Sequence, residues 1–229
     1  MDFPALQPVR KAYEAGFVAE AARLARELAP ALDTPEMLAL AELMHEQLAF
    51  AGLVEAWRKR RTITGLEDRE LQPWANALNA LAVEHVRERR TDEALPLFTL
   101  ALESAPELRY VRRNLASCLL EKGEVLQAMI ELDYLLASEP GDTDSLLLSG
   151  IAHYQVGDPQ AALEPLQKAA DAGSPEAALQ LLKAQCLLDQ TAAAAATLAQ
   201  LRALYPERAE AMIAAELSEP GSPLHRLQS

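Results

Sequence analysis

The chain has 229 residues, of which 34 are acidic and 21 basic, giving a formal net charge of −13 at pH 7. This charge repels phosphate backbones and anionic lipid headgroups, so we expect neither nucleic acid nor a membrane surface as partner. Hydrophobic residues make up 50% of the chain and aromatic residues only 5%. A composition dominated by Ala and Leu excludes a disordered chain and predicts an all-α protein.

The sequence shows no targeting or membrane-spanning feature. The first residues lack the basic and apolar regions of a signal peptide, and no apolar run approaches the ~18 residues of a transmembrane helix. Two cysteines, Cys118 and Cys186, are too few for a disulfide framework. We therefore expect a cytoplasmic protein with reduced thiols.

Residues 1–66 read as two degenerate helical hairpins. In the first, Gly16 precedes a helix that Pro30 closes, and the second extends from Pro35 through Gly52 to about Thr64. The polar stretch 62–72 is the weakest junction and could separate two sub-bundles. We favour one continuous solenoid, because neither flank is large enough to be stable alone.

Residues 75–176 contain a repeat of 34 residues. Three residue types recur at this interval: Ala94, Ala128 and Ala162; Gly123 and Gly157; Pro106 and Pro140. Glycine suits the left-handed conformation at the end of a helix, and proline cannot continue one. A third set of small residues in the same phase is expected where two helices cross closely: Ala82, Ala116 and Gly150.

This pattern resembles the tetratricopeptide repeat family. The first repeat carries it as Leu78, Leu81-Ala82, His85, Ala94, Phe98 and Pro106, and the next two keep the register. The departures are in the family's Trp slot (Leu78, Arg112, Leu146) and its Tyr slot (His85, Leu119, His153). The resemblance implies pairs of antiparallel helices that stack into a right-handed superhelix.

The C-terminal part reads as one more degenerate repeat and a cap. A helix from Pro175 to about Asp189 pairs with an Ala-rich helix over 191–204, and a last helix over 207–217 covers the stack. The predicted fold is thus a right-handed α-α solenoid over residues 1–217, with about six hairpins and a capping helix. Residues 177–217 form the degenerate repeat and cap, and 218–229 are expected to be a flexible tail.

No catalytic or metal-binding motif stands out. His45-Glu46 begins like the zinc-protease motif HExxH, but position 49 is Ala instead of the second ligand. Cys118 and Cys186 lie two repeats apart, too far for a disulfide if the repeats stack. We therefore expect no catalytic residues, no metal, no cofactor and no enzymatic activity.

Two basic runs, 58–61 and 87–90, have two interpretations. Positive charge at the end of a helix complements the helix dipole, which explains both runs without a ligand. Alternatively, together with Arg109, Arg112 and Arg113, they form a positive patch for an acidic peptide or a carboxylate.

The resemblance implies that the first helix of each hairpin lines a concave face that takes a peptide or helix of a partner. By helical phase, the inward-facing candidates are Asn76, Asn79, Val83, Arg87, Tyr110, Arg113, Asn114, Ser117, Asp144, Leu147, Leu148, Ile151 and Tyr154. Asn114 falls in the slot of the backbone-clamping Asn of peptide-binding family members. The family's carboxylate clamp is incomplete, because the third repeat has Asp144 and apolar residues instead of basic ones.

The sequence therefore predicts a non-catalytic scaffold, adaptor or chaperone-like protein that binds a protein or peptide partner in its groove. The main alternative is a structural solenoid that associates with itself, as in a homodimer, with the apolar stretch of the third repeat packed against a neighbour. A ligand sensor or enzyme is the remaining alternative.

Overall fold

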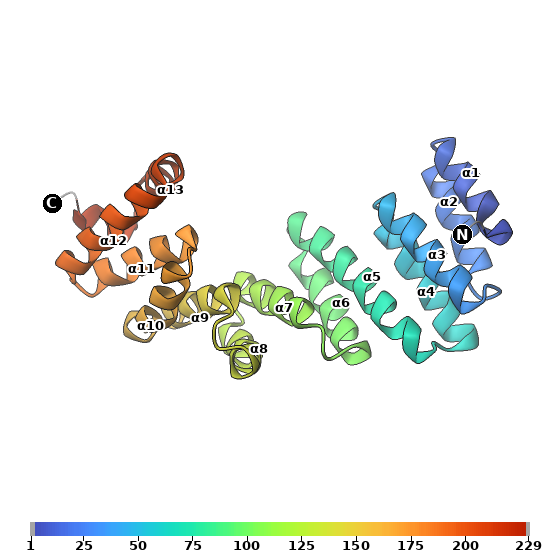
Figure 1. Cartoon of the computed structure of the whole chain (residues 1–229), viewed down its shortest axis with the longest axis horizontal. Coiled ribbons are helices and arrows are strands. Elements are labelled where there is room, and N and C mark those ends of the chain that lie inside the picture. Colours follow the sequence, from blue (N-terminus) through green and yellow to red (C-terminus); the bar gives the residue numbers. More distant parts are fainter. Residues whose placement is uncertain (1–2, 228–229) are drawn as a thin grey trace. The chain divides into compact units, whose positions relative to one another are not determined.

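The computed structural model describes residues 3–227, which form thirteen α-helices, two short 3-10 helices and no strand (Figure 1). The chain divides into two compact units, one ending at Cys118 and the other beginning at Leu119, so that the boundary falls within helix α7 (Arg109–Lys122). Each unit is described by itself below.

The first unit is a stack of antiparallel helices. Its elements are η1 (Pro4–Leu6), α1 (Gln7–Glu14), α2 (Val18–Leu28), α3 (Thr34–Glu46), α4 (Phe50–Thr64), α5 (Asp68–Arg87), α6 (Thr91–Ser104) and the first part of α7. Helices α1 and α2, α3 and α4, and α5 and α6 pack as pairs, and α4 also packs on α5. First helices touch one another as well, since α3 contacts α5.

The second unit repeats this arrangement. It contains the end of α7, then α8 (Val125–Ser138), α9 (Thr143–Gln155), α10 (Pro159–Asp171), α11 (Pro175–Leu187), α12 (Thr191–Leu204), α13 (Pro206–Ser218) and η2 (Pro223–Leu227). Helix α11 packs on α9, α10, α12, α13 and η2. In both units successive helices pair as hairpins, and α13 follows the last of them, so the predicted all-α, TPR-like solenoid is confirmed.

A left-handed residue ends the first helix of every hairpin. The six positions are Gly16, Leu48, Arg89, Gly123, Gly157 and Asp189, with φ between 53° and 82°. At each, the next amide donates to a carbonyl five residues back, as in Gly123-Glu124, where the Glu124 amide reaches the Leu119 carbonyl at 2.9 Å. This is a Schellman C-cap, and it confirms the role predicted for Gly123 and Gly157.

The predicted prolines and small residues act as expected. Helix α6 ends two residues before Pro106, and α8 ends two residues before Pro140. A Cβ atom added to Gly150 would lie 2.3 Å from Cγ of Leu166 on α10, so the two helices of this hairpin approach closely there. Gly52 lies inside α4 rather than at the hairpin turn, and its missing Cβ makes room for Ala22 of α2.

The junction at 62–72 is mostly helical rather than a long loop. Only residues 65–67 separate α4 from α5, and α5 begins with a capping box in which Glu67 and Glu70 exchange hydrogen bonds with each other's backbone amides. Arg60 and Glu70 form an ion pair of 2.7 Å with side chains 7% and 0% exposed. Arg60 also donates to the carbonyl of Leu32 at 2.6 Å, so one side chain connects α4, α5 and the loop before α3.

The C-terminal end packs onto the second unit. Leu224 in η2 is buried in the cluster that α11, α12 and α13 form, and Arg226 donates to the carbonyl of Cys186 at 2.9 Å. The segment expected to be a flexible tail therefore contains an ordered 3-10 helix up to Leu227. Its last two residues, like the first two of the chain, lie outside the described residues.

Candidate functional site

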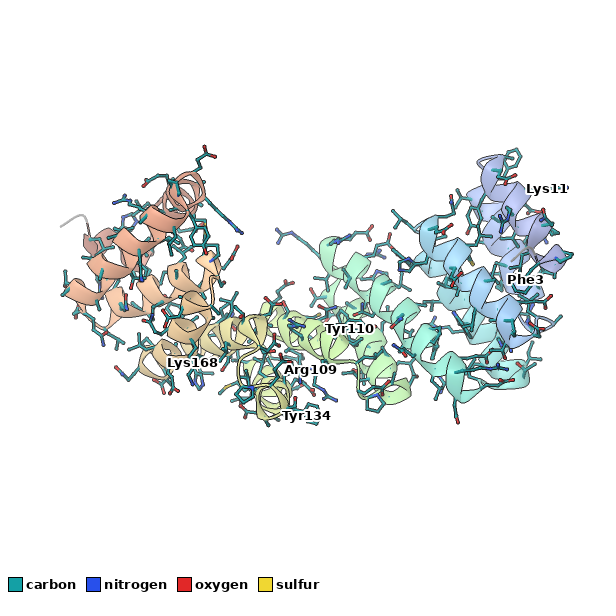
Figure 2. The ribbon with its side chains drawn as sticks, in the orientation of Figure 1. Phe3, Lys11, Arg109, Tyr110, Tyr134 and Lys168 are labelled. Carbon is teal, nitrogen blue, oxygen red and sulfur yellow. The ribbon has the colours of Figure 1, made fainter. Side chains whose placement is uncertain are left out.

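A row of polar side chains runs across the first helices of the first unit. Asn76 and Asn79 lie on α5, and Tyr110 (labelled in Figure 2) and Asn114 lie on α7, 34 residues after Asn76 and 35 after Asn79. The Tyr110 hydroxyl donates to Oδ1 of Asn76, and Nδ2 of Asn114 donates to Oδ1 of Asn79 at 2.8 Å. The structure thus brings these four predicted residues together as two cross-helix pairs, which we call the amide row.

The amide row stays open to solvent and keeps hydrogen-bonding capacity. Asn76 is exposed, Asn79 and Asn114 are half-buried, and Tyr110 is 38% exposed. A carboxamide has two N–H donors and an oxygen with two lone pairs, so the bond between Asn79 and Asn114 uses only part of what each can offer. Partial burial, followed by the nearby Glu107, raises the pKa of Tyr110, which therefore remains a neutral hydroxyl at pH 7.

The other predicted groove residues of this unit lie beside the amide row. Arg113 and Ser117 on α7 are half-buried, and Arg87 is exposed in the last turn of α5. Val83 is half-buried one turn before Arg87. All of them belong to first helices, as the resemblance implies.

The predicted apolar stretch lies on α9 in the second unit, where part of it packs internally. Leu147 and Tyr154 pack against a cluster that includes Leu166 and Leu181. The ammonium group of Lys183 on α11 lies 5.8 Å from the centre of the Tyr154 ring and 2.9 Å from a carboxylate oxygen of Glu216 on α13. Tyr154 thus contributes to contacts among first helices.

Leu148 and Ile151 are half-buried on the same helix, and Asp144 is exposed in its first turn. Burial raises the pKa of Tyr154, and the nearby Glu216 adds to this effect. The predicted groove residues therefore form two groups in different units, one polar on α5 and α7 and one apolar on α9.

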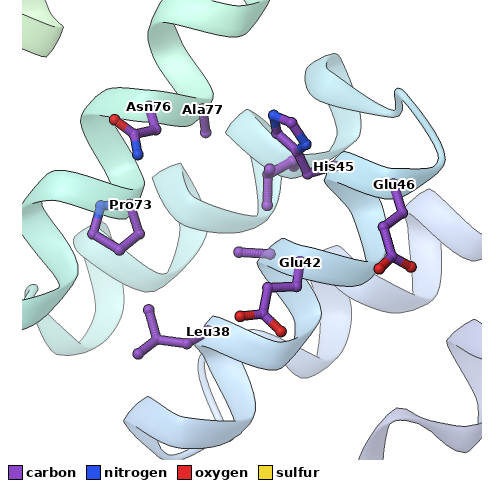
Figure 3. Close-up of a pocket in the computed structure, with 9 residues that line it drawn as sticks. Leu38, Glu42, His45, Glu46, Pro73, Asn76 and Ala77 are labelled. Atoms are coloured by element: carbon purple, nitrogen blue, oxygen red, sulfur yellow. The ribbon is translucent and has the colours of Figure 1, made fainter.

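A depression that the sequence did not predict lies between α3 and α5, with a volume of about 480 Å³ (Figure 3). Its apolar lining comes from Leu38, Ala41, Leu53, Pro73 and Ala77. Its polar lining comes from Glu42, His45 and Glu46 on α3 and from Asn76, which also belongs to the amide row. We call it the α3–α5 pocket.

Sequence reasoning missed this pocket because the repeat is degenerate before residue 75, so no phase was available to assign an inward face to α3. The His45-Glu46 pair was the one signal in the region, and we considered it only as a metal motif. His45 instead packs edge-on against Phe50, with ring centres 5.3 Å apart.

The basic run 58–61 does not act as a unit. Arg60 points into the protein and pairs with Glu70, whereas Arg58 and Arg61 are exposed. Within residues 3–227, no three His, Cys, Asp or Glu side chains are grouped as a metal site would require. No described helix is long and apolar enough to cross a membrane.

Both cysteines, Cys118 and Cys186, are buried thiols that form no disulfide. Burial raises the pKa of the Cys186 thiol, although the nearby Arg226 opposes this effect. A protonated, buried thiol is a poor nucleophile and a good packing group.

Comparison with known proteins agrees with the hairpin architecture. Residues 85–149 match the family model described as tetratricopeptide repeat. No curated protein matches the chain. A TPR protein of Thermus thermophilus is 25% identical, with a TM-score of 0.54 over 67% of this chain and 86% of the other.

Two further solved structures share the fold at lower identity. MamA from Desulfovibrio magneticus RS-1 is 15% identical, with a TM-score of 0.62 over 76% of this chain and 95% of the other. YrrB, described as a TPR protein with an unusual peptide-binding site, is 18% identical, with a TM-score of 0.53 over 76% and 89%. Stacked repeats of this kind provide extended surfaces for binding other proteins. Residues 85–149 therefore match the tetratricopeptide repeat family, a family of protein-interaction scaffolds, and the described part of the chain shares the helical-hairpin fold of the solved TPR proteins.

Proposed function

We propose that the protein binds an extended peptide segment of a partner protein across the first helices of its first unit, without catalysing a reaction. The amide row carries this proposal: Asn76 and Asn79 on α5 meet Tyr110 and Asn114 on α7 at an exposed surface. Carboxamides both donate and accept, so they can bond to the N–H and C=O groups of a peptide backbone whatever its side chains.

The remaining groove residues extend the proposed surface. Arg87, Arg113 and Ser117 add donors next to the amide row, and a guanidinium group suits carboxylates or carbonyls of the partner. On the second unit, Leu148 and Ile151 are the apolar residues of α9 proposed to contact an amphipathic partner, with Leu147 and Tyr154 supporting them.

The test selects ligands from a phage-displayed library of 12-residue peptides and measures their affinity by fluorescence anisotropy. Asn114→Ala and Asn79→Ala should each weaken binding about fivefold to tenfold, because each removes hydrogen bonds worth roughly 0.5–1.5 kcal/mol. Thr99→Ala is the matched control, since Thr99 is exposed on α6 and bonds only to its own helix at Leu95. Selected peptides that bind all three variants as tightly as the wild type would contradict the proposal.

Self-association is the second candidate function, and an observation on α8 favours it. Leu126, Ile130 and Tyr134 recur every four residues along α8 and are 73%, 68% and 56% exposed. Figure 2 labels Tyr134 on this helix. A second copy could cover this stripe. Light scattering after size-exclusion chromatography decides: a wild-type dimer that Ile130→Glu converts to a monomer supports self-association, and a wild-type monomer rejects it.

A further inference from the structure

We infer that the α3–α5 pocket binds a basic side chain, arginine or lysine, flanked by apolar residues of the partner peptide. This inference rests on the proposed function, because Asn76 belongs both to the pocket and to the amide row. It adds what the amide row cannot provide, a preference for particular side chains.

The lining of the pocket suits an apolar stem. Leu38, Ala41, Pro73 and Ala77 offer aliphatic surface on both α3 and α5 (Figure 3). The volume of about 480 Å³ falls within the range of small ligand sites, roughly 300–1,000 Å³, and is sufficient for a long side chain and a neighbouring residue. Arginine and lysine have aliphatic stems that lie on apolar surface while the charged end stays near water.

The edge of the pocket suits a cationic end group. Glu42 and Glu46 are exposed, four residues apart on α3, and therefore on one face of the helix. No residue from 3 to 227 forms an ion pair or side-chain hydrogen bond with either carboxylate, and no Lys or Arg lines the pocket. Like charges at this spacing repel each other, so a cation bound between or beside them would relieve the repulsion.

The same chemistry argues against other ligands. An acidic peptide would be repelled by the two carboxylates and by the net charge of −13. A purely apolar peptide would cover Glu42 and Glu46 without offering either a partner, which is costly for a charged group. The Arg side chain is favoured over Lys, because its planar group can donate two parallel hydrogen bonds to one carboxylate.

The experiment uses three synthetic peptides with Gly-Ser flanks and a central Leu-Arg-Leu, Leu-Gln-Leu or Leu-Glu-Leu, and it measures their affinity for the full chain by calorimetry. Wild type should bind the Arg peptide about fivefold more tightly than the Gln peptide, the effect expected of one or two exposed ion pairs. Glu42→Gln/Glu46→Gln should abolish this preference, and Glu42→Lys/Glu46→Lys should reverse it in favour of the Glu peptide.

Glu14→Gln/Glu103→Gln is the matched control. It removes two exposed carboxylates from the same unit away from the pocket, so it changes the net charge equally and should keep the preference for Arg. Equal affinity of wild type for the Arg and Gln peptides, or no binding of either, would overturn the inference without any variant. So would an equal loss of preference in the control.

Asn114→Ala separates this inference from the proposed function. It should weaken the Arg and Gln peptides by the same factor and leave their ratio unchanged. If Asn114→Ala has no effect while the Arg preference persists, the amide-row proposal fails and the pocket stands. If Asn114→Ala weakens both peptides and no Arg preference exists, the pocket fails and the amide row stands.

Discussion

Arg60 shows how one side chain can decide the stability of the first unit. It pairs with Glu70 inside the protein and also bonds to the carbonyls of Ala29 and Leu32. Removing one partner of a buried ion pair leaves an uncompensated charge in a medium of low polarity. The pair therefore matters more than any of the exposed ion pairs of the chain.

We predict that Arg60→Met lowers the free energy of unfolding by about 3–5 kcal/mol, because it leaves the Glu70 carboxylate buried without a cation. Arg60→Met/Glu70→Leu should cost less than Arg60→Met alone, since the second change removes the stranded charge. Urea denaturation followed by circular dichroism measures both. Arg26→Met is the control, because Arg26 pairs with Glu55 at the surface and should cost at most about 1 kcal/mol.

The left-handed residues at the hairpin turns are the second feature at this scale. Three of the six are glycine, but Leu48, Arg89 and Asp189 adopt the same backbone with φ of 53°, 60° and 56°. A side chain in this conformation costs roughly 1–2 kcal/mol, apart from Asp, which tolerates it better. These turns therefore store strain that glycine would relieve.

We predict that Arg89→Gly stabilises the protein by about 0.5–1 kcal/mol, the relieved strain less the greater freedom of glycine in the unfolded chain. The midpoint of thermal unfolding should rise. Gly123→Ala is the reverse experiment: no atom lies within 4 Å of the added Cβ, so any loss of stability comes from the backbone alone. An unchanged midpoint for both variants would show that these turns are not strained.

At the scale of helices, the sequence predicted a helix boundary where the backbone preference of a single residue type indicates one. Pro106 and Pro140 follow helix ends, and Gly123 and Gly157 mark hairpin turns, as their backbone preferences predict. Proline alone is not decisive, because Pro73, Pro96 and Pro165 lie inside helices. Leu48 and Arg89 escaped prediction, since neither residue type indicates a left-handed turn. The start of α5 at Asp68 escaped as well, because a capping box of two glutamates resembles an ordinary polar loop.

The candidate site was predictable to a similar degree. Helical phase placed Asn79 and Asn114 on first helices one repeat apart, and the structure pairs them. Phase could not show that Tyr154 packs against the next hairpin, because burial depends on residues distant in sequence. The burial of Arg60 was hidden for the same reason, since a basic residue near a helix end usually faces water.

We predict that Gly150→Ala destabilises the protein by up to about 2 kcal/mol. Alanine favours the helix by about 1 kcal/mol, but its Cβ would overlap Leu166, and overpacking costs typically 1–3 kcal/mol. Because Leu166 is fully buried, it has little room to move. Gly141→Ala is the control in the same unit, since nothing lies within 4 Å of its added Cβ and its stability should be unchanged. A gain of stability at position 150 would show that α9 and α10 can separate.

At the scale of the whole molecule, repeat architecture makes stability a sum of local terms. Among the described residues, helices make most of their contacts with their neighbours along the stack: α3 contacts α4 and α5, and α11 contacts α9, α10, α12 and α13. A solenoid of this kind unfolds in segments, and a substitution that destabilises one hairpin destabilises mainly the adjacent hairpins. The helices proposed to bind the peptide can therefore stay folded while another hairpin of the stack opens locally.

We predict that amide hydrogen exchange, read by mass spectrometry, separates the two units. Arg60→Met should speed exchange in α2 to α5 and leave α10 to α13 at wild-type rates, because its lost contacts all lie between Ala29 and Glu70. Gly150→Ala should do the opposite, since its overlap falls between α9 and α10. The two variants serve as controls for each other, because their altered contacts lie in different units. Uniform acceleration along the whole chain in either variant would mean that the units unfold together, and the additive description of this solenoid would be wrong.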